Sequence, residues 1–434
     1  MSRDVWVTGI GITCPLGTDV ETVAEAQREG RSGARPLDEV FDAPGLPVLG
    51  VCRVPDWDAA SALGADAETL LGRDDRKTEF GLHAALQAVR QAFGGVAAAR
   101  RLGEGSRRFA MHLASGLVSA SVADTEAGLL RRLTEAGDYD HALASRLMRE
   151  PSLHRGRHLT DRTNHLLARR LGWAGPSLVN HAACAAGATA IGVAARWVRR
   201  GRCDVALAGG FESMIHPFGL LSFQMLGALS ERRDCRPEQV SRPFDRTRDG
   251  FVIGEGAGML VLEAEEHARA RGAACLGRVR GLGTSLDSHR ITAPPADGRG
   301  AVSAMRGALE EAGVGAEDIE YVNAHGTATP LNDKAETAAI HRVFGPRGVA
   351  PPVSSSKSAL GHTVAAAGAV EAVLSLLAMR DGILPPTLNL HEPDPECDLD
   401  CIPLVARSQR VTTVLSNSFG FGGVNASLVL GASV

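Results

Sequence analysis

The sequence lacks the features of several protein classes. Its 46 basic residues are outnumbered by 50 acidic ones, and the net charge of −4 offers none of the positive field that nucleic-acid binding requires. No apolar run approaches the roughly 18 residues of a membrane helix, and the N-terminal apolar segment is too interrupted for a signal peptide. The eight cysteines are scattered without zinc-site spacing. We therefore expect a globular, cytoplasmic protein that binds no metal, nucleic acid or membrane.

Lysine is also scarce. Only three of the 46 basic residues are lysines, at positions 77, 334 and 357. A planar guanidinium is a poor substitute for a compact ammonium group. In a chain that otherwise uses arginine, we expect a lysine to remain where a compact positive charge is needed.

The 434-residue chain does contain a regular alternation of short apolar runs and alanine-rich helical stretches. This alternation predicts an α/β fold in which helices cover the faces of a sheet. The chain is long enough for two core-bearing halves. The predicted strands include residues 4–12, 108–114, 177–183, 204–210, 258–264, 277–284 and 319–325, and the predicted helices include residues 79–93, 185–200 and 300–312.

Two segments far apart in the chain resemble each other. Residues 184–204 and 365–385 align on a shared Ala-Ala-Gly triplet, and each has the pattern of a helix closed by a turn after a basic residue. Alanine-rich helices can resemble one another by chance, but a recurring helix and turn also indicates two copies of one α/β unit packed together.

Cys184 lies among small residues in VNHAACAAGAT (residues 179–189), after an apolar run and before a predicted helix. One interpretation is a structural thiol, because free cysteine is commonly buried. The other is a nucleophile, because the N-terminus of a helix favours thiolate and lowers a cysteine pKa from about 8.5 to roughly 3.5–7.5. In that case Gly187 would let a substrate approach the backbone closely.

A second stretch, YVNAHGTATPLNDKAE (residues 321–336), carries a histidine at the end of a predicted strand. The strand delivers His325 into a loop with the hydroxyl groups of Thr327 and Thr329, which suits a histidine that faces a polar ligand. A structural role for His325 alone is also open.

A third stretch, SSSKSALGHTVAAAGAVE (residues 354–371), contains Lys357, His362 and Glu371. A turn at Gly361 would direct the lysine and the histidine into one cavity. His362 alone could be structural, but two of the three lysines of the chain lie in this stretch and the previous one, which favours function.

A glycine-rich segment, LSNSFGFGGVNAS (residues 415–427), surrounds Phe421 with Gly420, Gly422 and Gly423. Glycine adopts positive φ without steric cost and allows a loop to move. The segment is interpreted either as a tight turn between strands with an aromatic plug, or as a gating loop that offers the N–H of Phe421 to an oxyanion.

Together these motifs resemble the elongating ketosynthases, the β-ketoacyl-[acyl carrier protein] synthase II group that includes type II polyketide enzymes. The matching segments follow in the right order over nearly the whole chain: ACAAG, DRTRDGFVIGEGAG, HRITAPPADG, NAHGTAT, KSALGHTVAAAGAVE and NSFGFGGVN. The resemblance implies the thiolase fold, with two pseudo-twofold-related α/β halves in a five-layered αβαβα core. Residues 1–267 would carry the nucleophile and residues 268–434 the two histidines.

The resemblance also implies a decarboxylative Claisen condensation. Cys184 would accept an acyl chain from a carrier protein, which splits one difficult carbon–carbon bond formation into two steps. Malonyl on a second carrier protein would lose CO₂, and its enolate would attack the acyl group. His325 and His362 would stabilise the enolate oxygen, while Lys357 and Glu371 would hold the histidines in position.

Further roles follow from the same resemblance. The N–H groups of Cys184 and Phe421 would form the oxyanion hole. Thr292, Thr327 and Thr329 would contact the phosphopantetheine arm, which the acyl carrier protein supplies, so that no bound cofactor is expected. The protein would be a homodimer, or a heterodimer with a chain-length-factor-like subunit.

Three related activities fit these residues less well. A biosynthetic thiolase uses a second active-site cysteine, and none lies near the C-terminal glycine loop. A starter-type synthase that acts on free coenzyme A uses asparagine where this chain has His362. A non-catalytic chain-length-factor subunit lacks the nucleophile that Cys184 provides.

Residues 113–175 depart from the family pattern. Leu117 and Val118 stand where glycines are expected at the foot of the acyl tunnel, and bulkier side chains would shorten the cavity because protein interiors have few spare voids. We expect a specialised pathway with short or unsaturated acyl chains; ordinary fatty-acid elongation is the alternative. Arg76 and Lys77 are candidates for docking the acidic carrier protein.

Overall fold

The computed structural model describes residues 3–40, 45–64, 76–116, 140–142 and 159–433. Within them lie one large ten-stranded sheet and two small two-stranded sheets. The strands of the large sheet are β1 (Val5–Thr13), β4 (Phe109–Ser115), β5 (Ser177–Asn180), β6 (Val205–Ser213), β7 (Glu255–Ala264), β8 (Gly277–Leu286), β9 (Tyr321–Asn323), β10 (Val353–Ser354), β13 (Thr413–Gly420) and β14 (Val424–Gly431). The small sheets pair β2 (Ala34–Pro36) with β3 (Gly50–Cys52) and β11 (Ile383–Leu384) with β12 (Arg407–Ser408).

Helices connect and cover these strands. The α-helices are α1 (Val20–Glu29), α2 (Ala59–Leu63), α4 (Arg76–Phe93), α5 (Val96–Gly103), α8 (Arg162–Leu171), α9 (Ala186–Arg199), α10 (Pro217–Met225), α11 (Glu265–Ala270), α12 (Arg299–Ala312), α13 (Pro330–Phe344), α14 (Lys357–Leu360) and α15 (Ala367–Asp381). Short 3₁₀ turns are η1 (Leu37–Glu39), η3 (Ala183–Ala185), η4 (Pro237–Gln239), η5 (Ala316–Asp318) and η6 (Val364–Ala366). The predicted α/β class is confirmed.

The large sheet contains the same arrangement of strands twice. One group has the order β1-β7-β6-β4-β5, and the other has the order β8-β14-β13-β9-β10. In each group the first two pairings are antiparallel and the last two are parallel. A short antiparallel contact between β1 and β8 joins the groups. Two copies of one α/β unit are therefore present, as the internal resemblance predicted; the predicted boundary at residue 267 falls within α11 and remains a prediction.

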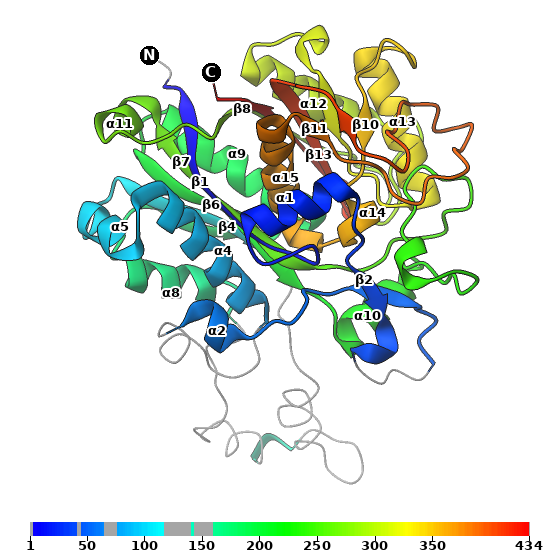
Figure 1. Ribbon diagram of the computed structural model, residues 1–434, viewed down its shortest axis with the longest axis horizontal. Helices are drawn as coiled ribbons and strands as arrows, with labels where there is room; N and C mark the ends of the chain where they lie inside the picture. Colours follow the sequence, from blue (N-terminus) through cyan, green and yellow to red (C-terminus); the bar gives the residue numbers. More distant parts are fainter. Residues whose placement is uncertain (1–2, 41–44, 65–75, 117–139, 143–158, 434) are drawn as a thin grey trace.

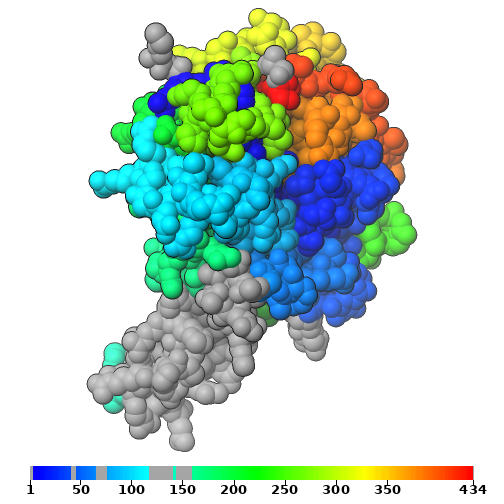
Figure 2. Space-filling model, turned by 60° about the vertical axis from the view of Figure 1, so that its left-hand side comes forward, coloured from blue at the N-terminus to red at the C-terminus, as the bar shows by residue number. Residues whose placement is uncertain are grey.

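The elements form five layers (Figure 1). Helices α9 and α15 pack against each other between the two groups of strands: α9 contacts β4 and β6, and α15 contacts β7 and β13. Outside the first group α4 covers β1 and β7, and outside the second α12 covers β8 and β14 with α13 beside it. Figure 2 turns the first outer layer toward the viewer, with the light-blue surface of α4 and α5 in front.

Close helix contacts explain several glycines. A Cβ on Gly9 or Gly11 of β1 would lie 2.1 or 1.9 Å from a backbone oxygen of α4, so these glycines let α4 lie directly on the strand. A Cβ on Gly187 would lie 2.8 Å from the backbone nitrogen of Ala369 in α15. Gly187 therefore allows the two central helices to cross closely. This corrects the sequence interpretation, in which Gly187 admits a substrate to the backbone.

The glycine-rich segment at 415–427 is the end of a β-hairpin. Strand β13 runs to Gly420, β14 begins at Val424, and residues 421–423 form the turn. Among the residues that the structure describes, no helix combines the length and apolar character needed to cross a bilayer.

Candidate active site

Cys184 lies where β5 passes through η3 into α9. The preceding residue, Ala183, has φ +46°, a left-handed conformation that is uncommon for a residue with a Cβ. This turn brings the sulfur to the floor of a pocket while leaving the residue only 6% exposed. The predicted position at the start of a helix is therefore observed.

His362 contacts the sulfur directly. Its Nε2 lies 3.1 Å from Cys184 Sγ, and the backbone N–H of Val364 donates to its Nδ1 at 3.3 Å. Burial, with the charge of Lys357 adding to it, holds the pKa of His362 well below its usual value. A neutral imidazole whose Nδ1 accepts a hydrogen bond carries its proton on Nε2. His362 therefore points an N–H donor at the sulfur.

His325 lies beside His362, at the end of β9. The two ring centroids are 5.3 Å apart at an interplanar angle of 83°. Burial lowers the pKa of His325 well below its usual value, and the positive charge of Lys357 acts in the same direction. Two neutral imidazoles thus face one pocket.

Lys357 and Glu371 form an ion pair behind the histidines. Their side chains are 1% and 0% exposed, and neither lines the pocket. Burial raises the pKa of Glu371 to about 7, although the lysine charge opposes this shift. The pair acts on the site through its charge, since Lys357 lowers the pKa of both histidines.

Burial also decides the state of the thiol. It raises the pKa of Cys184 to about 11, and the opposing effects of Lys357 and of the Phe421 and Cys184 backbone N–H groups are smaller. The lowered pKa expected from the helix N-terminus is therefore wrong. The site holds a neutral thiol that a neutral imidazole contacts through its N–H.

The hairpin turn closes over the sulfur. A Cβ on Gly420 would lie 3.1 Å from the backbone nitrogen of Cys184, so glycine lets the strand approach this closely without a shift of its neighbours. Gly422 and Gly423 have φ +86° and +78°, and the N–H of Gly422 donates to the carbonyl of Ile291 at 2.7 Å. The turn is thus tied to the 287–292 segment and presents the N–H of Phe421 toward Cys184.

These groups share one pocket of about 380 Å³. Most of the residues singled out from the sequence line it: Cys184, Thr292, His325, Thr327, Thr329, His362, Gly420, Phe421 and Gly423. The hydroxyls of Thr327 and Thr329 lie 2.9 Å apart. Among the described residues, no group of His, Cys, Asp and Glu side chains is arranged to hold a metal ion.

Arg76 and Lys77 require a correction. Arg76 Nη2 lies 2.5 Å from Oε1 of Glu255, whose side chain is 1% exposed, and Lys77 is itself 6% exposed. They do not form the exposed basic rim that the sequence suggested, because Lys77 is buried and Arg76, whose side chain is 26% exposed, is paired with a buried carboxylate. The presence of charged residues in a sequence does not show whether their side chains are exposed.

Sequence reasoning missed Glu336, which holds the backbone of the histidine loop. Its two carboxylate oxygens accept the N–H groups of His325 at 2.9 Å and Gly326 at 2.8 Å, and Asn417 donates to it at 3.1 Å. Burial raises the pKa of Glu336 to about 7. The available signal was an acidic residue in an apolar-facing position of the helix after the loop.

Two protein-family models match the chain. One, described as "Beta-ketoacyl synthase, N-terminal domain", matches residues 2–268, and the other, "Beta-ketoacyl synthase, C-terminal domain", matches residues 276–391.

Curated relatives cover almost the full length. The chain is 40% identical to 3-oxoacyl-[acyl-carrier-protein] synthase 2 of Rhizobium meliloti (strain 1021), over 99% of this chain and 98% of that protein. It is 38% identical to a putative polyketide beta-ketoacyl synthase 1 of Streptomyces cyaneus, again over 99% and 98%.

Solved structures agree. A type II PKS ketosynthase in complex with its acyl-carrier protein and bound to the hexaketide matches with TM-score 0.86 and 31% identity over 100% of both chains. The ishigamide ketosynthase/chain length factor matches with TM-score 0.83 and 35% identity, also over 100% of both chains.

Proposed function

Because the chain belongs to the β-ketoacyl synthase family, we propose that its own residues divide the family reaction between Cys184 and two neutral histidines. The enzyme condenses an acyl-enzyme thioester with malonyl-[acyl carrier protein], releases CO₂ and forms β-ketoacyl-[acyl carrier protein]. The assignment of steps to residues is our proposal.

In the first step, the sulfur of Cys184 attacks the carbonyl carbon of the acyl thioester. The new carbon–sulfur bond forms, the bond to the carrier arm breaks, and the thiol proton leaves with the departing arm sulfur. The N–H of His362 Nε2, at 3.1 Å, stabilises negative charge on the attacking sulfur. The N–H groups of Cys184 and Phe421 stabilise the tetrahedral oxyanion.

In the second step, the malonyl thioester loses CO₂ and the electron pair of the broken bond becomes an enolate. The Nε2–H of His362 and the neutral ring of His325 stabilise its oxygen. Their low pKa values keep them uncharged donors, which avoids protonating the carbon nucleophile. The enolate carbon then attacks the acyl carbonyl, the carbon–sulfur bond to Cys184 breaks, and the released thiolate takes up a proton from water to restore the thiol. The Lys357–Glu371 ion pair keeps the two histidines in position.

One observation carries this proposal: the sulfur of Cys184, the tautomer-defined N–H of His362 and the ring of His325 converge in a single pocket of about 380 Å³. The test is intact-mass analysis after incubation with an acyl carrier protein substrate. One acyl adduct is expected, and Cys184→Ala should abolish it. Cys235→Ala, at a half-buried cysteine, is the matched control and should keep the adduct. An adduct that survives in Cys184→Ala would refute the proposal.

The phosphopantetheine arm of the carrier protein would enter along Thr292, Thr327 and Thr329, with no other cofactor. A homodimer, or a heterodimer with a chain-length-factor-like subunit, is supported by β5, which ends the large sheet in the described part of the chain and carries Leu178 at 52% exposure. The eight free thiols suit a reducing, cytoplasmic setting.

We further propose a specialised polyketide or fatty-acid-like pathway with short or unsaturated acyl chains, and ordinary fatty-acid elongation as the second candidate. Leu117 and Val118, on which the length argument depends, lie outside the described residues. The two-part division at residue 267 is likewise a proposal. A competition among carrier-bound acyl chains, scored by the adduct on Cys184, tests the preference; preferential loading of long saturated chains would favour ordinary elongation.

A further inference from the structure

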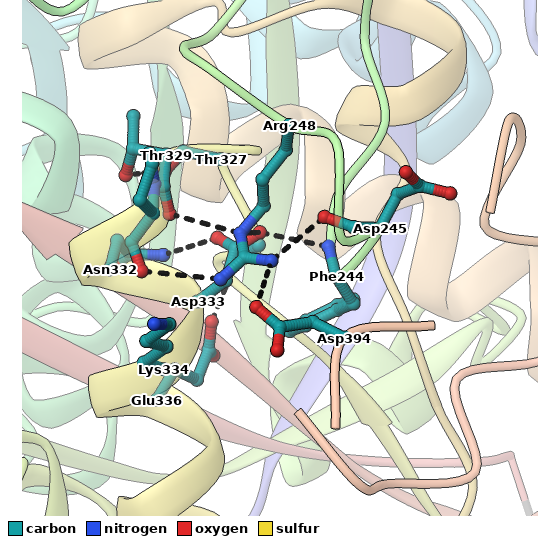
Figure 3. Close-up of polar contacts among 12 residues, drawn as sticks. Phe244, Asp245, Arg248, Thr327, Thr329, Asn332, Asp333, Lys334, Glu336 and Asp394 are labelled. Atoms are coloured by element: carbon teal, nitrogen blue, oxygen red, sulfur yellow. Dashed lines mark hydrogen bonds and ion pairs between the residues drawn. The ribbon is translucent and has the colours of Figure 1, made fainter. Parts of the chain in front are cut away.

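A buried arginine outside the pocket joins three segments of the chain. Figure 3 shows Arg248 at the centre of a polar cluster, and its side chain is 2% exposed. It pairs with Asp333 (Nε to Oδ2, 3.3 Å) in the first turn of α13 and with Asp394 (Nη1 to Oδ2, 2.7 Å). It also donates to the carbonyl of Asp245 at 2.8 Å. These contacts bring residues 245–248, 329–333 and 394 together.

The guanidinium of Arg248 also binds the backbone of the loop that lines the pocket. It donates to the carbonyl oxygens of Thr329 at 3.5 Å and Pro330 at 3.2 Å. The carboxylate of Asp333 accepts the N–H of Phe244 at 2.9 Å and a backbone hydrogen bond from Thr327. The backbone of both pocket-facing threonines is therefore fixed, directly or through Asp333, by one side chain behind the loop.

The held loop is strained. Ala328, between the two threonines, has φ +67°, and Phe244 has φ +64°. Non-glycine residues are disfavoured in this region and persist only where the surrounding contacts hold them there. The ring of Phe244 also fits against Gly326, where a Cβ would lie 3.2 Å from its Cε2. Without Arg248, the loop would lose the hydrogen bonds to its backbone and would relax from this conformation.

We propose that Arg248 is a positioning residue for the carrier arm: it holds Thr327 and Thr329 in the conformation that receives the arm, without touching the reacting atoms. The proposal rests on the proposed function, which assigns the arm to these threonines. Cys184 and the histidines are fixed by other contacts, since Glu336 holds the backbone of His325. Arg248 thus acts on arm binding more than on the chemical step.

Lysine cannot replace this arginine. A guanidinium has five N–H donors in a planar fork, whereas an ammonium is a point charge with three donors on a flexible stem. Arg248 uses its fork on two carboxylates and three carbonyls that lie in different directions. Arg248→Lys therefore keeps the charge that Asp333 and Asp394 need but loses the geometry.

The experiment compares two substrates in the decarboxylation assay: malonyl-pantetheine, and the S-ethyl malonyl thioester, which has the reacting group without the arm. For Arg248→Lys, we expect KM for malonyl-pantetheine to rise roughly 10- to 100-fold, the range that follows from displacing a positioning group by about 1 Å. The values of kcat/KM for the S-ethyl thioester and the rate of Cys184 alkylation should stay within about twofold of wild type.

Three comparisons keep the test decisive. Asp394→Asn loosens the same contacts from their more exposed side and should give a smaller rise for malonyl-pantetheine only; it decides the matter if Arg248→Lys does not fold. Arg271→Lys, which alters the ion pair with buried Glu263 in the first half of the chain, should change neither substrate. Combining Arg248→Lys with Thr329→Val should add little to Thr329→Val alone, because both act on the same arm contact.

An equal loss for both thioesters, or an unchanged KM for malonyl-pantetheine, would overturn the proposal and leave Arg248 a purely structural residue. A wild-type chain that decarboxylates neither thioester would instead overturn the proposed function and this inference with it.

Discussion

The two histidines should differ in their effect on acyl loading, because only one contacts the nucleophile. His362 Nε2 lies 3.1 Å from Cys184 Sγ, whereas His325 faces the pocket beside it. Removing one oxyanion donor typically costs about 2.7–4 kcal/mol, or roughly 10²–10³ in rate. Decarboxylation should therefore fall by that factor in both His325→Ala and His362→Ala.

Loading should separate the variants. His362→Ala also removes a hydrogen bond to the sulfur as it becomes negative, and hydrogen bonds to charged groups contribute about 1.5–3 kcal/mol. Transfer of the acyl group to the cysteine should slow by roughly 10- to 100-fold in His362→Ala and by less than about threefold in His325→Ala.

The assay is single-turnover acylation followed by intact mass, with CO₂ release from malonyl-carrier protein measured on the same preparations. His341→Ala, at a histidine that pairs with Asp398 at the surface, is the control and should change neither rate. Equal slowing of loading in His325→Ala and His362→Ala would refute the tautomer argument, as would decarboxylation that survives either change.

Four further outcomes are expected. Because the pKa of Cys184 is raised to about 11, its alkylation by iodoacetamide should rise about tenfold per pH unit from pH 7 to 9.5; a plateau below pH 9 would contradict this. Gly187→Ala should lower the free energy of unfolding by about 1–3 kcal/mol, since its Cβ would lie 2.8 Å from a backbone nitrogen of α15, whereas Gly307→Ala, with no contact under 3.4 Å, should not. The pKa of Glu336 is raised to about 7, so the unfolded state releases its proton first and stability falls as pH rises from about 4.5 to 7; Glu336→Gln should reduce this slope by at most about 1.4 kcal/mol per pH unit in urea titrations. Arg290 is exposed at the pocket mouth, and Arg290→Glu should raise KM for carrier-bound substrate and weaken its salt dependence; an unchanged salt dependence would reject this docking role.

Local signals made much of the fold and site predictable. Apolar runs and alanine-rich stretches indicate strands and helices, because the spacing of apolar residues along an element reflects which of its faces is buried. Cys184, His325 and His362 stand out because each follows such an element in a small-residue loop. The network around Arg248 has no such signal, because its partner Asp333 lies 85 positions from Arg248 and 89 positions from Phe244. Tertiary packing alone brings them together.

The same distinction explains the errors about charge. A helix N-terminus is a local feature, and it was correctly placed at Cys184. The desolvation that raises the pKa of this thiol comes from surrounding segments that the sequence around it does not contain. Lys77 is another case, since its burial depends on what α4 packs against. The position of a residue in the fold can be inferred from the sequence around it, whereas its pKa and its burial depend on the whole protein interior.

The internal duplication explains how the nucleophile and its histidine meet. The turn η3 leads into α9 as η6 leads into α15, and the first residues of the two turns, Ala183 and Val364, have φ +46° and +48°. In each copy, therefore, the chain passes through one residue in the left-handed conformation shortly before it enters a central helix. In one copy the next residue is Cys184; in the other, a histidine precedes the step by two residues.

That histidine, His362, has a counterpart in His181, which precedes Ala183 by the same two residues. His181 Nδ1 instead lies 2.6 Å from the carbonyl oxygen of Ser115, and His181 is not among the residues that line the pocket. Because α9 and α15 cross at Gly187 and Gly368 with Cβ-forbidding contacts of 2.8 Å, the two turns are brought to the same point. A duplicated unit thus forms the active site by placing the nucleophile, Cys184, in one copy and the hydrogen-bond donor, His362, in the other.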